Sequence, residues 1–398
     1  MILTINGGSS SIKFALFEVG KLPEKACYGQ LTRVGTTGTR FTVNSESIPV
    51  PVTAATYQDA IDFLVEWLEQ NIEFSDVKAI GHRIVHGMQH TEPSLITDDL
   101  LKDLKNITAY DPDHLPYEIL LIEGFQKNHS DIKQYACFDT AFHKDMPQVA
   151  KLLPIPRRFD RLGIHRYGFH GLSYQYLMQE LEQTAGRQIA HGRIIIAHLG
   201  NGASLAAIKH GKSIDTSMGF TPDSGVPMST RTGDLDPGVA WFMMQSEHLT
   251  PKQFNHLISC ESGLLGISET SGDMHDLLQL EETDIRAAEA VSLFCYQVKK
   301  WIGGFAAALG GIDTIIFTGG IGENSPSIRA RICEGLGFLG IEINDERNQK
   351  NAAFISATSN VSIRVMHTDE EMMIAKLGYN MIGIPAKEKL HIKDIHHA

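Results

Sequence analysis

Cysteine is scarce in this sequence, and its scarcity excludes a disulfide-based scaffold. Only five of the 398 residues are cysteines, an odd number, and no two of them form a C-x-x-C pair. Cysteines without such pairing typically behave as small, buried hydrophobic side chains in a reducing compartment, so we expect no zinc or redox site. The five are Cys27, Cys137, Cys260, Cys295 and Cys333.

Basic residues and long apolar runs are also few. The chain has 35 Lys and Arg against 47 Asp and Glu, and its net charge of −12 argues against nucleic acid as a partner. The weakly charged stretch at residues 301–312 contains glycines and is far shorter than the roughly 20 residues that span a bilayer. Because the N-terminus lacks a cationic start before its apolar residues, we expect no signal peptide, no membrane association and a cytoplasmic location.

The composition is that of a globular protein, and the sequence contains an internal repeat. Hydrophobic residues make up 42% of the chain, enough for two or three domains with cores of their own. Apolar runs at residues 2–5 and 12–17, separated by a Gly/Ser turn, predict a hairpin, and residues 193–208 repeat this order. We interpret the repeat as duplication of one α/β unit, with chance similarity of two hairpins as the alternative.

Helical periodicity lies between and after the hairpins. Residues 56–70 place Ala60, Ile61 and Leu64 on one stripe behind a predicted Thr56 N-cap, and residues 284–309 form a longer helix that ends at two glycines. A strand from residue 313 leads into a Gly-rich turn at 319–324, and a helix that starts at Ser325 and Pro326 is predicted to run through Leu336. A strand, a glycine turn and a helix N-terminus together favour phosphate binding.

Several motifs supply the groups that phosphoryl transfer requires. None of the glycine segments matches a P-loop or a dinucleotide fingerprint. Together, however, they offer backbone amides for phosphates, while polar segments offer cations, and carboxylates for a metal or for positioning. In chain order the motifs are NGGSSSIKF, GHRIVHG, FDTAFH, RYGFHG, HLGNGAS, STRTGDLDPG, FTGGIGENS and TDEEMMIAKL.

These eight motifs resemble, in order and spacing, those of the acetate and propionate kinase family. The resemblance spans residues 2–377 and implies the fold of actin, sugar kinases and Hsp70 ATPases, in which two duplicated ribonuclease-H-like α/β domains flank an interdomain cleft. It predicts one domain at 1–145 plus 372–398, closed by the C-terminal helix. The second, at 146–371, would carry most nucleotide contacts.

The resemblance also implies roles for individual residues. Asp139 matches the catalytic aspartate, and His170 and Arg231 match the pair that stabilises the transition state. Arg83 matches the arginine that binds the substrate carboxylate, while Val85, Phe169 and Pro222 match apolar positions around the substrate methyl group. Asn6 and Glu370 match metal-site residues, and Lys13 matches a lysine that contacts ATP phosphates. The remaining nucleotide positions are His198, Leu199, Gly200, Asn201, Gly202, Asp273, Met274, His275, Gly320, Ile321, Gly322, Glu323 and Asn324.

The implied reaction is reversible transfer of the ATP γ-phosphoryl group to acetate, giving acetyl phosphate and ADP, with Mg²⁺ as cofactor or Mn²⁺ in its place. A homodimer is expected from the family. Because a carboxylate nucleophile is already ionised at neutral pH, Asp139 is expected to orient the substrate or the metal and not to act as a strong base. The nearest alternatives are a propionate, butyrate or other short-chain acid kinase.

Two segments depart from the family pattern. Around residues 109–116, Asp113 stands where a leucine usually lines the methyl pocket, and we interpret it as a turn-capping residue, with a polar substrate as the alternative. His275 stands where an arginine usually meets the nucleotide, which leaves a diphosphate-dependent relative open. We expect His82, His86 and His143 to be structural.

Two further classes of protein fit these motifs less well. A non-catalytic actin-like nucleotide switch would need only phosphate loops, whereas this sequence also keeps Arg83, Asp139 and Glu370. A sugar kinase of the same superfold would need a base and a polar pocket, whereas the matched positions are apolar. For Arg83 the structural alternative is an ordinary ion pair, and for Lys13 it is a solvated side chain at a strand end.

Overall fold

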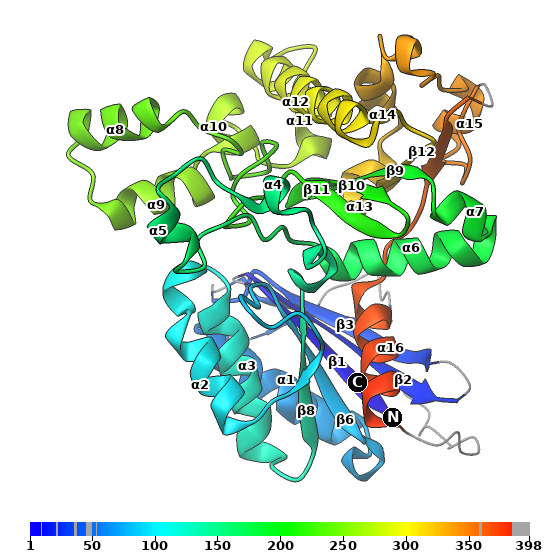
Figure 1. Ribbon diagram of the computed structural model, residues 1–398. Coiled ribbons are helices and arrows are strands. Elements are labelled where there is room, and N and C mark those ends of the chain that lie inside the picture. Colours follow the sequence, from blue (N-terminus) through cyan, green and yellow to red (C-terminus); the bar gives the residue numbers. More distant parts are fainter. Residues whose placement is uncertain are drawn as a thin grey trace. The chain divides into compact units, whose positions relative to one another are not determined.

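The chain folds as an α/β protein, as the sequence predicts. A computed structural model describes residues 1–8, 10–20, 23–35, 38–44, 50–52, 54–357 and 360–383. Its contacts define two compact units (Figure 1): unit 1 is Met1–Ala141 with Asp369–Ala398, and unit 2 is Phe142–Thr368. The domain boundaries predicted from the sequence were 145/146 and 371/372.

Unit 1 is built on a mixed sheet that begins with the predicted hairpin. Its strands are ordered β5-β4-β3-β2-β1-β6-β8-β7, with β1 antiparallel to β2 and parallel to β6. The strands are β1 (Ile2–Gly7), β2 (Ser11–Val19), β3 (Pro23–Thr32), β4 (Arg40–Val43), β5 (Val50–Pro51), β6 (Ala79–Ile84), β7 (Ser94–Leu95) and β8 (Lys133–Phe138).

Helices bury the apolar strand residues of unit 1. They are α1 (Tyr57–Asn71), η1 (Phe74–Asp76), α2 (Asp98–Asn106), η2 (Thr108–Tyr110), α3 (Leu115–Asn128) and α16 (Glu370–Ile382). As predicted, Thr56 caps α1, in a capping box with Asp59. The predicted stripe on α1 is buried in a core where Phe14, Phe41 and Trp67 pack ring against ring.

Unit 2 repeats the sheet topology of unit 1, which supports the duplication. Its order is β11-β10-β9-β12-β13, three antiparallel strands followed by two parallel ones, as in β3-β2-β1-β6-β8. The strands are β9 (Arg193–Leu199), β10 (Ala203–Lys209), β11 (Lys212–Thr216), β12 (Thr314–Thr318) and β13 (Ser362–Val365). The two predicted hairpins are therefore equivalent elements of the two sheets.

Helices surround this second sheet. They are α4 (Gln148–Lys151), α5 (Arg157–Asp160), α6 (Gly171–Ala185), α7 (Arg187–Ala190), α8 (Pro237–Ser246), α9 (Pro251–Cys260), α10 (Gly263–Ser268), α11 (Met274–Leu280), α12 (Ile285–Leu309), α13 (Gly319–Asn324), α14 (Pro326–Cys333), η4 (Gly337–Leu339) and α15 (Asp345–Gln349). A further short helix, η3 (Ala141–His143), spans the junction at 141/142.

Most predicted elements of unit 2 are confirmed, and two differ. Helix α12 begins after Asp284 and ends at Gly310, as predicted. The expected turn at 319–324 is instead the short helix α13, because residues after β12 continue directly into helical hydrogen bonds. Helix α14 ends at Cys333 and not at Leu336, since the backbone angles of Glu334 are already non-helical.

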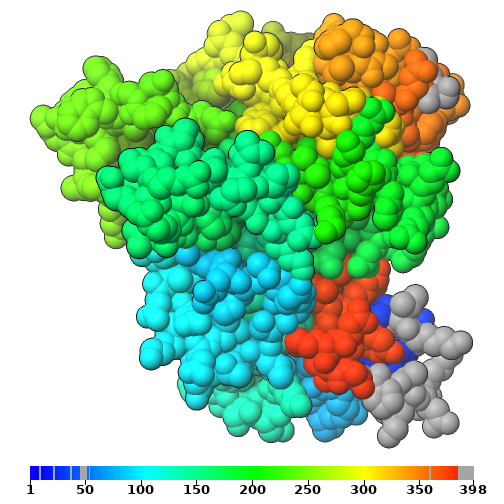
Figure 2. All heavy atoms as spheres, in the orientation of Figure 1, coloured from blue at the N-terminus to red at the C-terminus, as the bar shows by residue number. Residues whose placement is uncertain are grey.

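The surface of unit 2 exposes one cysteine and one apolar helix. Cys260, expected to be buried, is exposed at the end of α9, whereas the other four cysteines are buried. Helix α8, yellow-green in Figure 2, buries none of its side chains, and Trp241 and Phe242 are 68% and 69% exposed. No helix within the described ranges is both long and apolar enough to cross a membrane.

Candidate functional site

In unit 1, strand register brings three predicted site residues into one row. Ile5 pairs with His82 in β6, and Arg83 pairs with Cys137 in β8, so Asn6, Arg83 and the chain just after β8 meet at the ends of parallel strands. Asp139 lies two residues beyond Cys137 and therefore faces the same side as Arg83. The carboxyl ends of parallel strands are where α/β folds bind ligands.

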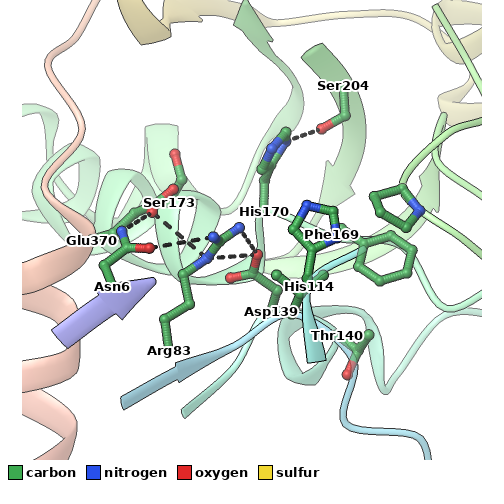
Figure 3. A network of polar contacts seen from close by, with 12 residues as sticks. Asn6, Arg83, His114, Asp139, Thr140, Phe169, His170, Ser173, Ser204 and Glu370 are labelled. Carbon is green, nitrogen blue, oxygen red and sulfur yellow. Dashed lines mark hydrogen bonds and ion pairs between the residues drawn. The ribbon is translucent and has the colours of Figure 1, made fainter. Parts of the chain in front are cut away.

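The Arg83 guanidinium is held by its neighbours in a fixed orientation (Figure 3). Its Nη2 and Nε donate to Oδ2 of Asp139 at 2.5 and 3.0 Å, and Nη1 donates to Oδ1 of Asn6 at 3.3 Å. Burial disfavours the charge, but Asp139 and Glu370 outweigh that effect and raise the pKa of Arg83. The arginine is therefore a permanent cation with N–H donors to spare for a second carboxylate.

Asn6 joins the strand ends to the start of α16. Its Nδ2 donates to Oε2 of Glu370 at 3.0 Å and to Oε1 of Glu371 at 3.1 Å. Amide and carboxylate oxygens are ligands that Mg²⁺ prefers, usually one or two protein carboxylates completed by water and substrate phosphates. The described residues contain no group of three or more His, Cys, Asp or Glu side chains that could hold a metal.

The segment before α3 holds two aspartates, Asp111 and Asp113. Residue His114 occupies the N-cap position of α3 without a side-chain capping bond. The buried carboxylate is Asp111, whose Oδ1 lies 2.8 Å from Nδ1 of His114. Proline at the start of α3 and the Asp111–His114 contact help to fix this turn, and the turn-capping role expected of Asp113 stays a prediction.

A buried acid that sequence reasoning missed supports Val85. Both carboxylate oxygens of Glu118 accept from the Val85 amide, at 3.0 and 3.2 Å, and Glu118 is 1% exposed. Burial, and after it the negative charge of Asp111, raise the pKa of Glu118 well above its usual value. Glu118 thus fixes the end of β6, where Val85 itself is buried.

Unit 1 also holds the predicted Lys13, which is exposed, and two histidines, which are buried. Lys13 is exposed on β2. His82 and His86 are buried and engaged internally, His82 with Gln134 at 2.6 Å and His86 with the Met88 amide at 3.2 Å. Burial lowers the pKa of His82 to about 4. These contacts fit the structural role expected of both histidines.

In unit 2, two histidines stack at the ends of α6 and β9. His170 precedes α6 in the left-handed conformation, with φ of 58°, and its ring stacks on His198 with centroids 4.3 Å apart. Nδ1 of His170 lies 2.8 Å from Oγ of Ser204 (Figure 3), and Nδ1 of His198 lies 2.9 Å from Oγ of Ser173. A non-glycine residue in this conformation is held there by surrounding contacts and often marks a functional site.

Arg231 and His170 converge on Gly202. A Cβ atom added to Gly202 would lie 3.3 Å from Nε2 of His170 and 3.7 Å from an Nη1 of Arg231. Arg231 is held by the Pro222 carbonyl at 3.2 Å and by Asp223, whose Oδ1 lies 3.4 Å from Nε. Glycine at 202 therefore lets the backbone loop approach both side chains with no Cβ atom between them.

The glycine segments that follow β9 and β12 are neighbours in the sheet. His198 pairs with Thr318, and a Cβ on Gly319 would collide with the Leu199 carbonyl at 2.6 Å. Gly319 has φ of 77°, which glycine tolerates best, so this close approach requires glycine. The predicted nucleotide residues 198–202 and 320–324 are thereby brought together within unit 2.

Several predicted nucleotide residues instead support this loop. Glu323 accepts from the Gly319 amide at 2.9 Å and from the Thr368 amide at 3.3 Å. Burial opposes its ionisation, but His367 and these amides outweigh burial and lower the pKa of Glu323. The Asn324 side chain returns to the Gly320 carbonyl, and Leu199 and Gly322 are buried, whereas Asn201 and Gly320 are exposed.

The third predicted nucleotide segment starts α11. Asp273 is its N-cap and accepts from the His275 amide at 2.9 Å, and Met274 is buried. The His275 side chain is exposed beside Gln279, at 3.3 Å. The histidine that replaces the family's arginine therefore lies at the surface of unit 2.

The remaining predicted positions of unit 2 are buried. Phe169 is 1% exposed, Pro222 is buried, and the Phe169 carbonyl lies 3.1 Å from Nε2 of His143. His143 also contacts Ser213 at 2.8 Å, and burial lowers the pKa of His143 to about 4, which fits the structural role predicted for it. Ser204, which belongs to the quoted motif HLGNGAS, and Asp223 were missed because their roles depend on contacts with His170 and Arg231.

Comparison with known proteins identifies relatives along nearly the whole chain. A model of the acetokinase family matches residues 1–376. Propionate kinase PduW of Salmonella typhimurium is 40% identical over 402 residues, covering 98% of this chain and 98% of the relative. Acetate kinase of Thermoanaerobacterium thermosaccharolyticum is 41% identical over 389 residues, covering 94% and 97%.

A solved structure also matches the fold. The propionate kinase of Francisella tularensis superimposes with a TM-score of 0.88 and 34% identity, over 94% of this chain and 98% of that one. Relatives named for acetate and relatives named for propionate are thus about equally similar to this chain.

Proposed function

The chain belongs to the acetokinase family, an enzyme family of carboxyl-acceptor phosphotransferases, and from this premise we propose that it transfers the γ-phosphoryl group of ATP to acetate. The products would be acetyl phosphate and ADP. The observation that carries the proposal is the convergence of His170 and Arg231 on Gly202, because the backbone loop there approaches both donors with no Cβ atom between them.

We propose that unit 1 binds the acceptor. The fixed Arg83 fork can take one or both oxygens of a carboxylate through its remaining donors. Asp139 keeps the fork oriented and repels any acceptor oxygen that lies on the wrong side. Since a carboxylate needs no deprotonation at neutral pH, these residues would only have to orient the acceptor.

We propose that unit 2 stabilises the transferring group. Negative charge spreads over the equatorial oxygens of a phosphoryl group during its transfer. Hydrogen-bond donors that are already in place stabilise this charge without reorganisation. Arg231 is held by Asp223 and Pro222, and His170 by Ser204, so both donors are pre-positioned. Backbone amides of the 198–202 and 319–320 segments would bind the other phosphates.

We propose that Asn6 and Glu370 hold Mg²⁺, with Glu371 beside them. Their oxygen donors suit this ion better than zinc or copper, which favour nitrogen and sulfur. When bound, Mg²⁺ would neutralise phosphate charge. The protein's own part is to keep the Asn6 amide and the Glu370 carboxylate side by side.

For the acceptor, acetate and propionate are the two candidates, because relatives with either name match this chain equally well. The apolar side chain of Val85 in unit 1 would favour a short alkyl group over a polar one. One methylene changes binding in an apolar pocket by only about 1–3 kcal/mol, so activity with both acids is expected.

A hydroxylamine trap for acyl phosphates tests this function. Acetate, propionate, butyrate and a hydroxy acid are each supplied with ATP and then with pyrophosphate. We expect hydroxamate from acetate and propionate with ATP. No hydroxamate from any acid would refute the kinase proposal, and product with pyrophosphate alone would refute ATP as donor.

We also propose that two copies associate through α8. Val239, Trp241 and Phe242 form an apolar surface on a helix that buries none of its own side chains. Exposed apolar clusters of this kind are typical of protein interfaces. Light scattering after size exclusion should give a dimer for the wild type and a monomer for the Trp241→Glu, Phe242→Glu variant. A monomer for the wild type as well as for the variant would refute the interface.

A further inference from the structure

Unit 2 contains a cavity that the proposed reaction does not use. It has a volume of about 930 Å³, within the range that holds small organic ligands. Apolar side chains of α9 and α12 line it, among them Leu257, Trp301 and Phe305. None of the proposed catalytic, substrate or nucleotide residues is among its lining residues.

The charged groups of the cavity favour a cation. Asp215, Asp234 and Glu261 line it, against the single ammonium of Lys300. Lys300 is drawn toward Gln297 at 3.4 Å and toward the ring of Tyr296. Acidic side chains therefore outnumber basic ones in the lining, although Glu261 also pairs with His256 and Arg166 acts on Asp215.

Two of the carboxylates have an oxygen available within the described part of the chain. Asp215 accepts from the Thr216 amide at 2.8 Å and Asp234 from the Gly225 amide at 2.9 Å, each through Oδ1. Burial raises the pKa of Asp215, which shows that its negative charge is poorly solvated. A cation between the carboxylates would relieve this desolvation.

The cavity wall is also the back of the Arg231 loop. Thr232 lines the cavity directly after Arg231, and its amide donates to the Ile258 carbonyl at 3.0 Å. A Cβ on Gly263, another lining residue, would collide with the Arg231 carbonyl at 2.7 Å. With so little space between them, a shift of this wall must move the Arg231 backbone.

From these observations we propose that the cavity is a regulatory site for an organic cation, an amine on an apolar body, whose binding is transmitted to Arg231. The ammonium lies between Asp215 and Asp234, and the apolar body packs on Trp301 and Phe305. The aromatic faces add a cation–π attraction. Ligand binding then changes turnover because the same loop carries Arg231.

Two adjacent glycines of α12 provide a matched pair of variants. An added Cβ meets nothing within 4 Å at either Gly303 or Gly304, but only Gly304 lines the cavity. A Cβ atom therefore fits at either position, and leucine favours the helix more than glycine does. Gly304→Leu fills the cavity and Gly303→Leu does not.

The binding experiment titrates the full chain with phenethylamine, followed by saturation-transfer NMR, with 2-phenylethanol as the neutral analogue. We expect a Kd of about 1 mM or tighter for the amine, and binding at least about tenfold weaker for the alcohol and for Asp215→Asn. Gly304→Leu should lose about tenfold and Gly303→Leu less than about twofold. Equal binding to both leucine variants, or equal binding of amine and alcohol, overturns the proposal.

A second readout tests transmission to Arg231. In a coupled assay of ADP release, saturating phenethylamine should change kcat by about twofold or more in the wild type and in Gly303→Leu, but not in Gly304→Leu. An unchanged kcat in the wild type overturns the regulatory role. Because NMR binding needs no activity, failure of the kinase reaction is distinguishable from failure of this site.

Discussion

The two units share a sheet topology but present different chemistry at the ends of their strands. In unit 1, charged side chains bind one another, with Arg83 set among Asp139 and Glu370. In unit 2, Gly202 and Gly319 bring backbone close to two donors, His170 and Arg231. The first arrangement makes stability depend on the site residues, whereas the second depends less on them, because the ion pair of Arg231 with Asp223 is partly exposed.

The largest effect predicted by this contrast is on stability. Arg83→Ala leaves Asp139, which is fully buried, without its cation, and such a loss costs about 3–5 kcal/mol. Chemical denaturation should therefore show a strongly destabilised protein. Arg231→Ala serves as the control in unit 2, where both partners are partly exposed, and its stability should change by less than about 1 kcal/mol. Equal destabilisation by both substitutions would remove the contrast.

Acid should destabilise both units through one buried histidine in each. The pKa of His82 and of His143 is about 4 in the folded chain, below the value of about 6.5 in the unfolded chain. Between these values only the unfolded chain takes up the proton, so stability falls as pH drops below 6.5. By pH 5 each histidine should contribute a loss of about 2 kcal/mol. His82→Asn and His143→Asn should each flatten the dependence of the unfolding free energy on pH between pH 6.5 and 4. An unchanged slope would contradict the lowered pKa values of these histidines.

Turnover should depend most on unit 2. Removal of one pre-positioned donor to a transition state typically lowers kcat on the order of 10²-fold, and we expect this of Arg231→Ala. Arg193→Ala, which removes an exposed ion pair with Asp313 in the same unit, is the control and should leave kcat near the wild-type value. Wild-type turnover by Arg231→Ala would exclude Arg231 from the mechanism.

The smallest predicted effect concerns the metal. Glu370→Gln keeps the size of the side chain and its contact with Asn6 but removes a charge, so the Mg²⁺ concentration for half-maximal activity should rise roughly tenfold. Glu346→Gln, a surface substitution in a one-turn ion pair with Lys350, should not alter it. The same Mg²⁺ dependence in both variants would place the metal elsewhere.

Much of this architecture was predictable because local signals and register agree with it. Thr56 and Asp284 start helices through side-chain capping bonds, and Gly310 ends one in the left-handed conformation that glycine adopts readily. The repeated hairpin revealed the duplicated sheet. The motif residues also occupied the strand ends where such folds bind ligands. Local chemistry and the topology of α/β folds thus account for this part.

The supporting residues were not predictable for a physical reason. Glu118 and Asp223 matter only through contacts with Val85 and Arg231, and such contacts depend on packing that no local pattern encodes. Spacing alone also could not tell which of two nearby aspartates, Asp111 or Asp113, turns inward, and Asp111 does.

The division of labour between the units is tested most directly by steady-state kinetics of two variants measured together, with acetate as the varied substrate. Arg83→Lys keeps a cation beside Asp139 but loses the fork, so it should raise the KM for acetate by about tenfold and change kcat less. Arg231→Ala should lower kcat on the order of 10²-fold with the KM for acetate close to the wild-type value. The reverse pattern, or the same pattern in both variants, would contradict the proposal that unit 1 binds the acceptor and unit 2 stabilises the transferring phosphoryl group.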